Sequence, residues 1–168
     1  MVEIPVAFVM NKPPFGAYSP KLFEAFANAA REMDTLLLLE PADITPNLKP
    51  YMDIIAPALK SSQVAANRKL IAGAKLVEII YDSSALAAVK AVKKIKPGVV
   101  VSLKADLDAN SHLLAEKLTA AGVEVIHFCA DINGDVPNGR KPEFIKDAFK
   151  KIHLHLGDKG IRDKVTLI

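Results

Sequence analysis

The chain has 168 residues, of which 51% are hydrophobic and 24% charged, a balance typical of one globular domain with a sizeable core. The start carries no signal-peptide pattern, and no apolar stretch approaches the ~20 residues that span a bilayer. The sequence therefore predicts a cytoplasmic protein with no membrane partner. The single cysteine, Cys129, excludes an internal disulfide and any metal or iron–sulfur site built from several thiolates of this chain.

The net charge of +3 comes mainly from scattered lysines. The densest group of lysines lies opposite an apolar row on a predicted helix, and it consists of Lys90, Lys93, Lys94 and Lys96. Charges arranged in this way are typical of a solvated helix face, so we expect no nucleic-acid partner.

Strand-length apolar runs alternate with amphipathic helical segments along the first half of the chain. Strands are predicted at 6–10, 36–39 and 76–81, and helices at 20–33 and 62–72. Ser19 can cap the first of these helices, with Pro20 at its first position. Its apolar stripe is expected to be Leu22, Phe26, Ala30 and Met33. The stretch EPADITPNLKPYMD contains three prolines, a composition that predicts a long loop. Whether residues 54–56 form a short extended segment in or after this loop stays open.

The same alternation continues in the second half of the chain. Helices are predicted at 84–95, 110–121 and 142–156, the last two closed by Gly122 and Gly157. Strands are predicted at 99–104, 123–129 and 165–168.

Strand–helix alternation of this kind predicts a parallel sheet, because parallel neighbours need a crossover connection. The whole chain, 1–168, is expected to form a single α/β domain. Two architectures remain open: a partial (β/α) TIM-like barrel that lacks its last strands, and an open doubly wound sheet. A sequential strand order would identify the barrel.

Ligands of both folds meet the carboxyl ends of the strands, so polar residues there are candidates for chemistry. Lys104 is the sharpest candidate, because the run VVVSLK places an ammonium group at the rim of an apolar sheet. There it could stabilise an anionic ring or a phosphate. The alternative is a lysine that simply leaves the sheet into water.

The loop ADINGDVPNGRKP is rich in polar groups and allows several interpretations. Asp131, Asn133 and Asp135 have EF-hand spacing, but Val136 and Pro142 stand where glycine and glutamate are required. Gly134 and Gly139 have the spacing of a phosphate loop, but Arg140 and Lys141 replace its lysine and hydroxyl residue. Two interpretations stay open, a flexible loop over a ligand and an ordinary solvated turn.

The histidines and the cysteine indicate no metal site. His153 and His155 are two apart on a helix and point in nearly opposite directions, so they cannot hold one metal together. His127 and Cys129 share one face of a strand with Val125, which favours core packing over a nucleophile with its base.

Four segments, in order, resemble the FMN-binding barrel domain of the glutamate synthase family. PPFGAYSPKLFEAFANAARE is similar to its first strand-to-helix loop, and VVVSLKADLDANSHLLAEKLTAAGVEVIHF to its lysine-ended strand and the helix that follows. ADINGD stands in place of its glycine-rich loop, and GIRDKVTLI resembles a late strand. The resemblance implies an FMN-dependent oxidoreductase that makes glutamate from 2-oxoglutarate. A non-catalytic domain that binds a small molecule or a partner is the alternative.

The resemblance also implies a cofactor-binding set. Gly16 and Ser19 match the loop near the flavin, Lys104 matches a lysine that faces the flavin ring, and Asp131 and Gly134 match the loop over the substrate side. No catalytic residue carries over. The family's glycine-rich motifs and its three cluster cysteines have no counterparts in this chain, which leaves open whether the chain is an enzyme.

In the family, the last strand here precedes the strands that build the phosphate site. The resemblance therefore implies either a piece of a longer protein or a naturally partial barrel. FMN is expected in the parent family but not on this chain alone. We also expect a homo-oligomer, or a further chain segment, to cover the open side of the barrel.

Overall fold

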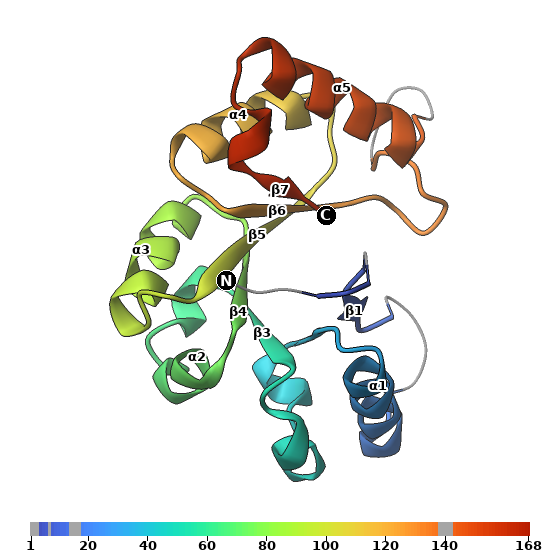
Figure 1. The fold of residues 1–168 in the computed structure, drawn as a ribbon, viewed down its shortest axis with the longest axis vertical. Helices are drawn as coiled ribbons and strands as arrows, with labels where there is room; N and C mark the ends of the chain where they lie inside the picture. The colour runs from blue at the N-terminus through green and yellow to red at the C-terminus, as the bar shows by residue number, and fades with distance from the viewer. Residues whose placement is uncertain (1–3, 7, 14–17, 138–142) are drawn as a thin grey trace. The chain divides into compact units, whose positions relative to one another are not determined.

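The computed structural model describes residues 4–6, 8–13, 18–137 and 143–168. The chain divides into two compact units, unit 1 with residues 1–101 and unit 2 with residues 102–168. We describe each unit by itself (Figure 1). None of the helices in the described ranges is long and apolar enough to cross a membrane.

Unit 1 alternates parallel strands with helices. Its strands are β1 (Met10–Asn11), β2 (Leu37–Leu39), β3 (Ile55–Leu59) and β4 (Leu76–Ile80), and β5 (Val100–Asp106) begins at its end. Its α-helices are α1 (Pro20–Glu32), α2 (Arg68–Gly73) and α3 (Ala85–Ile95). Short 3₁₀ helices η1 (Pro41–Asp43), η2 (Pro46–Tyr51) and η3 (Ser61–Gln63) occupy the loops after β2 and β3.

Unit 2 continues the pattern with most of β5, then α4 (Ser111–Ala120), β6 (Val125–Cys129), α5 (Ile145–Asp158), η4 (Arg162–Lys164) and β7 (Thr166–Leu167). Within unit 1 the strands pair in parallel in the order β1, β2, β3, β4, and within unit 2 in the order β5, β6, β7. A doubly wound sheet reverses its strand order part-way, and neither unit does so. The partial TIM-like barrel predicted from the sequence is therefore confirmed as the fold class.

The first helix begins as its residues predict and buries a different stripe. The Ser19 hydroxyl accepts a hydrogen bond from the Leu22 backbone N–H at 3.2 Å, and Pro20 is the first helical residue. However, the fully buried positions are Phe23, Ala27 and Ala30, whereas Met33 is exposed. The predicted stripe was wrong by one position at Leu22 and Phe26, because the direction in which a helix packs depends on the strand beneath it.

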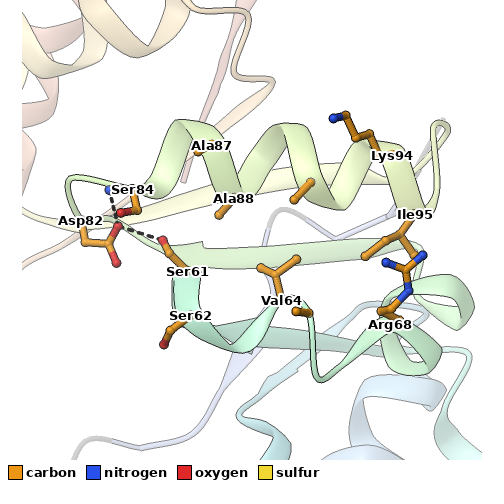
Figure 2. A pocket seen from close by; sticks show the side chains of 12 residues that line it. Ser61, Ser62, Val64, Arg68, Asp82, Ser84, Ala87, Ala88, Lys94 and Ile95 are labelled. Atoms are coloured by element: carbon orange, nitrogen blue, oxygen red, sulfur yellow. Dashed lines mark hydrogen bonds between the residues drawn. The ribbon is translucent and has the colours of Figure 1, made fainter.

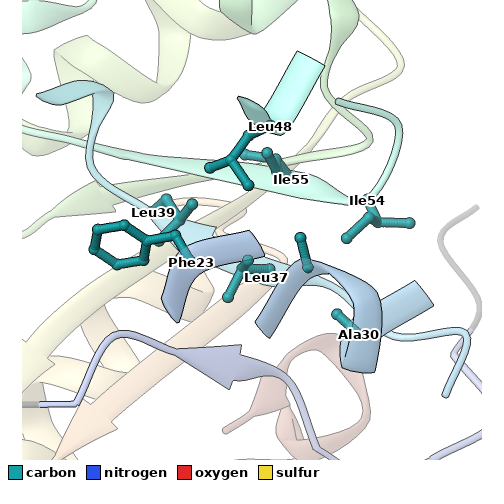
Figure 3. Close-up of a cluster of buried hydrophobic side chains, with 8 residues drawn as sticks. Phe23, Ala30, Leu37, Leu39, Leu48, Ile54 and Ile55 are labelled. Carbon is teal, nitrogen blue, oxygen red and sulfur yellow. The ribbon is translucent and has the colours of Figure 1, made fainter. Parts of the chain in front are cut away.

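The core of unit 1 lies between α1 and the sheet (Figure 3). Phe23 and Ala30 from the helix meet Leu37 and Leu39 of β2 and Ile55 of β3. Leu48 of η2 joins this cluster and is completely buried, so the proline-rich stretch is an ordered part of the core. The extended piece left open at 54–56 is strand β3.

Other predicted bounds need correction. The helix predicted at 62–72 is η3 followed by turns and the short α2, and the first predicted strand is reduced to Met10–Asn11, with Ala7 outside the described residues. Helix α5 continues one residue past Gly157, and Gly160 takes the positive φ of 66° after its end. Gly122 closes α4 as predicted, with φ 79°.

Candidate active site

Two faces of β5 and β6 are chemically different in unit 2. One face is apolar and lies under α4 and α5 (Figure 1). Phe128 of β6 meets Phe149 of α5 edge-on, with ring centroids 6.3 Å apart. Ile126 lies on the same face as Phe128, because side chains alternate along a strand, and it is fully buried. This face anchors the strands to the helices.

The opposite face of these strands carries polar side chains. Alternation places Ser102, Lys104 and Asp106 of β5 on it, and His127 and Cys129 of β6. In the strand register Lys104 lies opposite His127, and Asp106 lies opposite Cys129. Lys104, His127 and Cys129 are all partly exposed at the carboxyl end of their strands. We call Lys104, Asp106, His127 and Cys129 the polar strand face.

His127 and Cys129 are in contact with each other. The Cys129 Sγ lies 3.7 Å from the His127 Nε2, within the range of a weak hydrogen bond to sulfur. Both side chains are partly exposed, so they do not pack in the core as the sequence favoured. The reason is their place at the last residues of β6, where the chain leaves the sheet.

Ser102 lies deeper on the same face of β5 and is completely buried. In the part of the chain that the structure describes, its Oγ has no hydrogen-bond partner. A buried hydroxyl without a partner costs roughly 1–3 kcal/mol, a cost that purely structural positions usually avoid. The polar character of this face therefore extends inward along β5.

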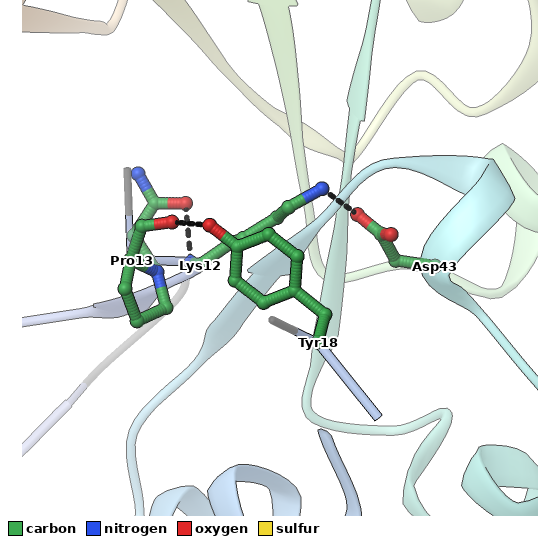
Figure 4. A network of polar contacts seen from close by, with 5 residues as sticks. Lys12, Pro13, Tyr18 and Asp43 are labelled. Carbon is green, nitrogen blue, oxygen red and sulfur yellow. Dashed lines mark hydrogen bonds and ion pairs between the residues drawn. The ribbon is translucent and has the colours of Figure 1, made fainter. Parts of the chain in front are cut away.

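A second polar group stands at the end of β1 in unit 1 (Figure 4). The Lys12 Nζ lies 2.9 Å from the Asp43 Oδ2 and 4.6 Å from the centroid of the Tyr18 ring. The Tyr18 hydroxyl in turn donates to the Pro13 carbonyl. The hydrogen bond to Asp43 raises the pKa of Lys12 above its ordinary value. Lys12 is thus held as an ammonium ion by its neighbours.

A groove of about 580 Å³ lies between η3 and α3 in unit 1 (Figure 2). One end is polar: the Asp82 carboxylate accepts hydrogen bonds from the Ser61 hydroxyl at 2.8 Å and from the Ser84 backbone N–H at 2.7 Å. The other end carries Arg68 and Lys94, and its middle is lined mainly by alanines and Val64. These contacts tie the loops after β3 and β4 together.

The loop after β6 is an ordered turn in its described part. The Asp131 carboxylate accepts hydrogen bonds from the backbone N–H groups of Asn133 and Asp135, at 2.8 and 2.9 Å. These bonds lower the pKa of Asp131 below its ordinary value. Gly134 has a φ of 83° and its N–H donates to the Asp131 carbonyl. Asp131 and Gly134 therefore shape this turn.

The five cofactor-binding residues predicted from the sequence do not form one described cluster. Gly16 lies outside the described residues. Ser19 caps α1, and Asp131 and Gly134 share the turn after β6. Lys104 alone lies on the polar strand face, where it is joined by His127 and Cys129.

Sequence reasoning missed one buried acid in unit 1. Glu78 is completely buried in the middle of β4, opposite Ala58 in the strand register. Alternation places it on the same face as Leu76. A glutamate inside the apolar run LVEII was the signal that could have identified it, because carboxylates are rarely buried without a role.

Comparison with known proteins gives a fold likeness. No protein-family model and no curated protein matches the chain. A solved structure, QR15, an aldolase, has a TM-score of 0.64 and 14% identity, and the match covers 99% of this chain and 80% of that one. A protein of Coccidioides immitis assigned as a deoxyribose-phosphate aldolase also has a TM-score of 0.64, at 10% identity. That match covers 95% of this chain and 69% of the other. At such identities the likeness shows the fold.

The resemblance to the glutamate synthase family was wrong. The similar structures bear aldolase names, and no family model supports an FMN-dependent glutamate synthase domain. The four matched segments were a capped alanine-rich helix, a strand that ends in lysine, a polar turn and a short strand. Such segments recur in any fold in which strands and helices alternate. Their order therefore indicated the fold class but carried no information about the reaction. The oxidoreductase function inferred from them is withdrawn.

Proposed function

We propose that this chain catalyses aldolase-type chemistry on a small carbonyl compound, with Lys104 forming a covalent imine with the substrate. The observation that carries this proposal is the place of Lys104 beside His127, on the polar strand face and at the carboxyl end of β5. Enzymes with (β/α) barrels place their active sites at this end of their strands. The aldolase names of the similar structures support the class of reaction.

An amine on a partly exposed strand end can perform the covalent step. The neutral Lys104 amine attacks the carbonyl carbon, and loss of water after proton transfer leaves a protonated imine. The positive nitrogen withdraws electrons, so the carbon next to the imine loses a proton more easily and becomes an enamine. The enamine then attacks the carbonyl carbon of a second substrate molecule, and a carbon–carbon bond forms. Water finally hydrolyses the imine, which releases the product and restores the amine.

Other lysines at strand ends suit this role less well. Lys12 follows β1, but its ion pair with Asp43 and its raised pKa keep it protonated, and an ammonium ion has no lone pair for attack. Lys60 follows β3 and is exposed at the start of η3. Lys104 combines partial burial with neighbours that can exchange protons.

The test is to trap the imine. The purified chain is incubated with acetaldehyde, acetone or dihydroxyacetone in the presence of cyanoborohydride, and the modified lysine is located by peptide mass spectrometry. We expect Lys104 to be modified before any other lysine, and Lys104→Met to lose that modification. Lys12→Met is the matched control and should keep it. Equal labelling of all exposed lysines, unchanged in Lys104→Met, would contradict the proposal.

We further propose that the chain acts on a small molecule, binds no nucleic acid and carries no FMN. We also propose that it acts in the cytoplasm as a homo-oligomer. Two lysines of the basic group support the absence of a nucleic-acid partner, because Lys93 donates to the Val99 carbonyl and Lys96 to the Ala74 carbonyl. Exposed Leu113 and Leu154 on α4 and α5 offer apolar surface for self-association. Sedimentation at several concentrations tests the oligomer, and the visible absorption of the purified chain tests for flavin.

A further inference from the structure

The register between β5 and β6 places a titratable side chain, that of His127, opposite Lys104. Residues paired between neighbouring strands lie about 4.8 Å apart, and their side chains project from the same face. His127 is the paired residue of Lys104 on β6. A substrate joined to Lys104 would therefore be attached to the strand face that also carries the imidazole.

One contact and one position distinguish His127 from Asp106, a second proton-exchanging group of the polar strand face. The His127 Nε2 lies 3.7 Å from the Cys129 Sγ, within the range of a weak hydrogen bond to sulfur. Asp106 is exposed and lies opposite Cys129, one pair further along the strands. An imidazole both accepts and donates a proton near neutral pH, which a carboxylate does less readily.

We propose that His127 is the catalytic residue that moves protons in the reaction at Lys104, and this proposal rests on the proposed function. His127 removes a proton from the carbon next to the protonated imine, and the electrons of that C–H bond form the enamine double bond while the imine nitrogen becomes neutral. When the enamine attacks the second carbonyl compound, the imidazolium returns its proton to the new alkoxide. The proton balance closes without any further reactant.

This step defines the substrate class. The donor must be an aldehyde or ketone that carries a hydrogen on the carbon next to its carbonyl, because that hydrogen is the one that His127 removes. A carbonyl compound without such a hydrogen can form the imine with Lys104 but cannot proceed to the enamine. Benzaldehyde is a probe of this kind.

The experiment separates imine formation from proton transfer. Exchange of the hydrogens next to the carbonyl is followed by NMR in D₂O, using whichever of acetaldehyde, acetone or dihydroxyacetone is trapped best on Lys104. We expect the wild-type chain to catalyse the exchange and His127→Gln to slow it by about 100-fold or more, the usual contribution of a general base. Trapping on Lys104 should persist in His127→Gln, which also shows that the variant is folded. His153→Gln, at an exposed histidine of α5, is the matched control.

Chemical rescue tests the role of the imidazole itself. Added imidazole should restore part of the exchange in His127→Ala and none in Lys104→Met, because the first variant lacks the base and the second lacks the imine. His127→Asn serves in place of His127→Gln if the larger amide disturbs folding. Exchange that stays within about threefold of wild type in His127→Gln, with Lys104 still trapped, would overturn the proposal for His127 and leave the proposed function intact. Absence of trapping on Lys104 in the wild type would overturn the proposed function itself.

Discussion

The strand face turned away from the helices differs between the two units. In unit 1 this face is mostly apolar, with the buried Glu78 as an exception, and Leu36, Leu38, Ala56 and Leu76 form a buried cluster on it. In unit 2 the corresponding face carries Lys104, Asp106, His127 and Cys129. The backbone alternation is the same in both, so side-chain choice alone makes one face a packing surface and the other a candidate site.

The strand ends show the same contrast. The polar groups of unit 1 are engaged with one another, as Lys12 is with Asp43 and Ser61 with Asp82. On the polar strand face, an amine, an imidazole and a thiol stand together. We place the chemistry in unit 2 because Lys104 and His127 are paired in the strand register near the carboxyl ends of β5 and β6.

The largest expected effect contrasts the two faces of β6. Ile126→Ala removes a fully buried side chain beneath the helices and should lower the free energy of unfolding by about 2–5 kcal/mol. Cys129→Ala, on the partly exposed opposite face, should lower it by less than about 1 kcal/mol. Urea unfolding followed by circular dichroism measures both. Equal losses would mean that the polar strand face is a packing surface after all.

The next effect concerns the turn after β6. Gly134 has a φ of 83°, and an added Cβ would lie 2.7 Å from the Phe144 ring. Gly134→Ala should therefore cost about 1–2 kcal/mol for the left-handed backbone and somewhat more because the ring must turn. Gly122→Ala is the control, with a φ of 79° and no atom within 4 Å of the added Cβ. In thermal unfolding, the melting temperature of Gly134→Ala should be lower than that of Gly122→Ala. The reverse order would argue against the ordered turn.

A smaller effect tests the pairing in unit 1. Asp43→Asn removes the charge that raises the pKa of Lys12, so that pKa should fall and Lys12 should react faster with acetic anhydride at neutral pH. Because this ion pair is near the surface, we expect a change in stability below about 1 kcal/mol. Peptide mass spectrometry reports the reaction at Lys12, and exposed Lys21 serves as the internal reference. Unchanged reactivity of Lys12 would show that the pair does not form in solution.

The smallest effect is the pH dependence of the contact between α4 and α5. The Glu116 carboxylate lies 2.6 Å from the His155 Nε2 and 3.1 Å from the Lys159 Nζ, and these bonds, that of His155 first, lower the pKa of Glu116. A carboxyl whose pKa is lowered by folding stabilises the folded chain at pH values above its unfolded-state pKa of about 4.3. This stabilisation is lost as the pH falls through the lower pKa of the folded state. The melting temperature of wild type should therefore fall more steeply below pH 4.3 than that of Glu116→Gln. Parallel curves would exclude the coupling.

The sequence by itself determined the local elements and their class. Ser19 and Pro20 start a helix, Gly122 ends one, and apolar runs separated by helices predict a parallel α/β fold, because caps, turns and periodicity act within a few residues. Lys104 was a candidate for the same reason, since a lysine at the end of an apolar strand is visible in the chain itself.

The tertiary structure decided which residues meet. Only the strand register brings His127 beside Lys104, only packing against β2 chooses Phe23 over Leu22, and only the core of unit 1 turns the proline-rich loop into η2 with Leu48 buried. The same limit explains the failed family resemblance, because short motifs record local structure whereas the chemistry depends on side chains from different strands. Such contacts join residues of different helices and strands, and their energies depend on the geometry of the sheet, which no local pattern contains.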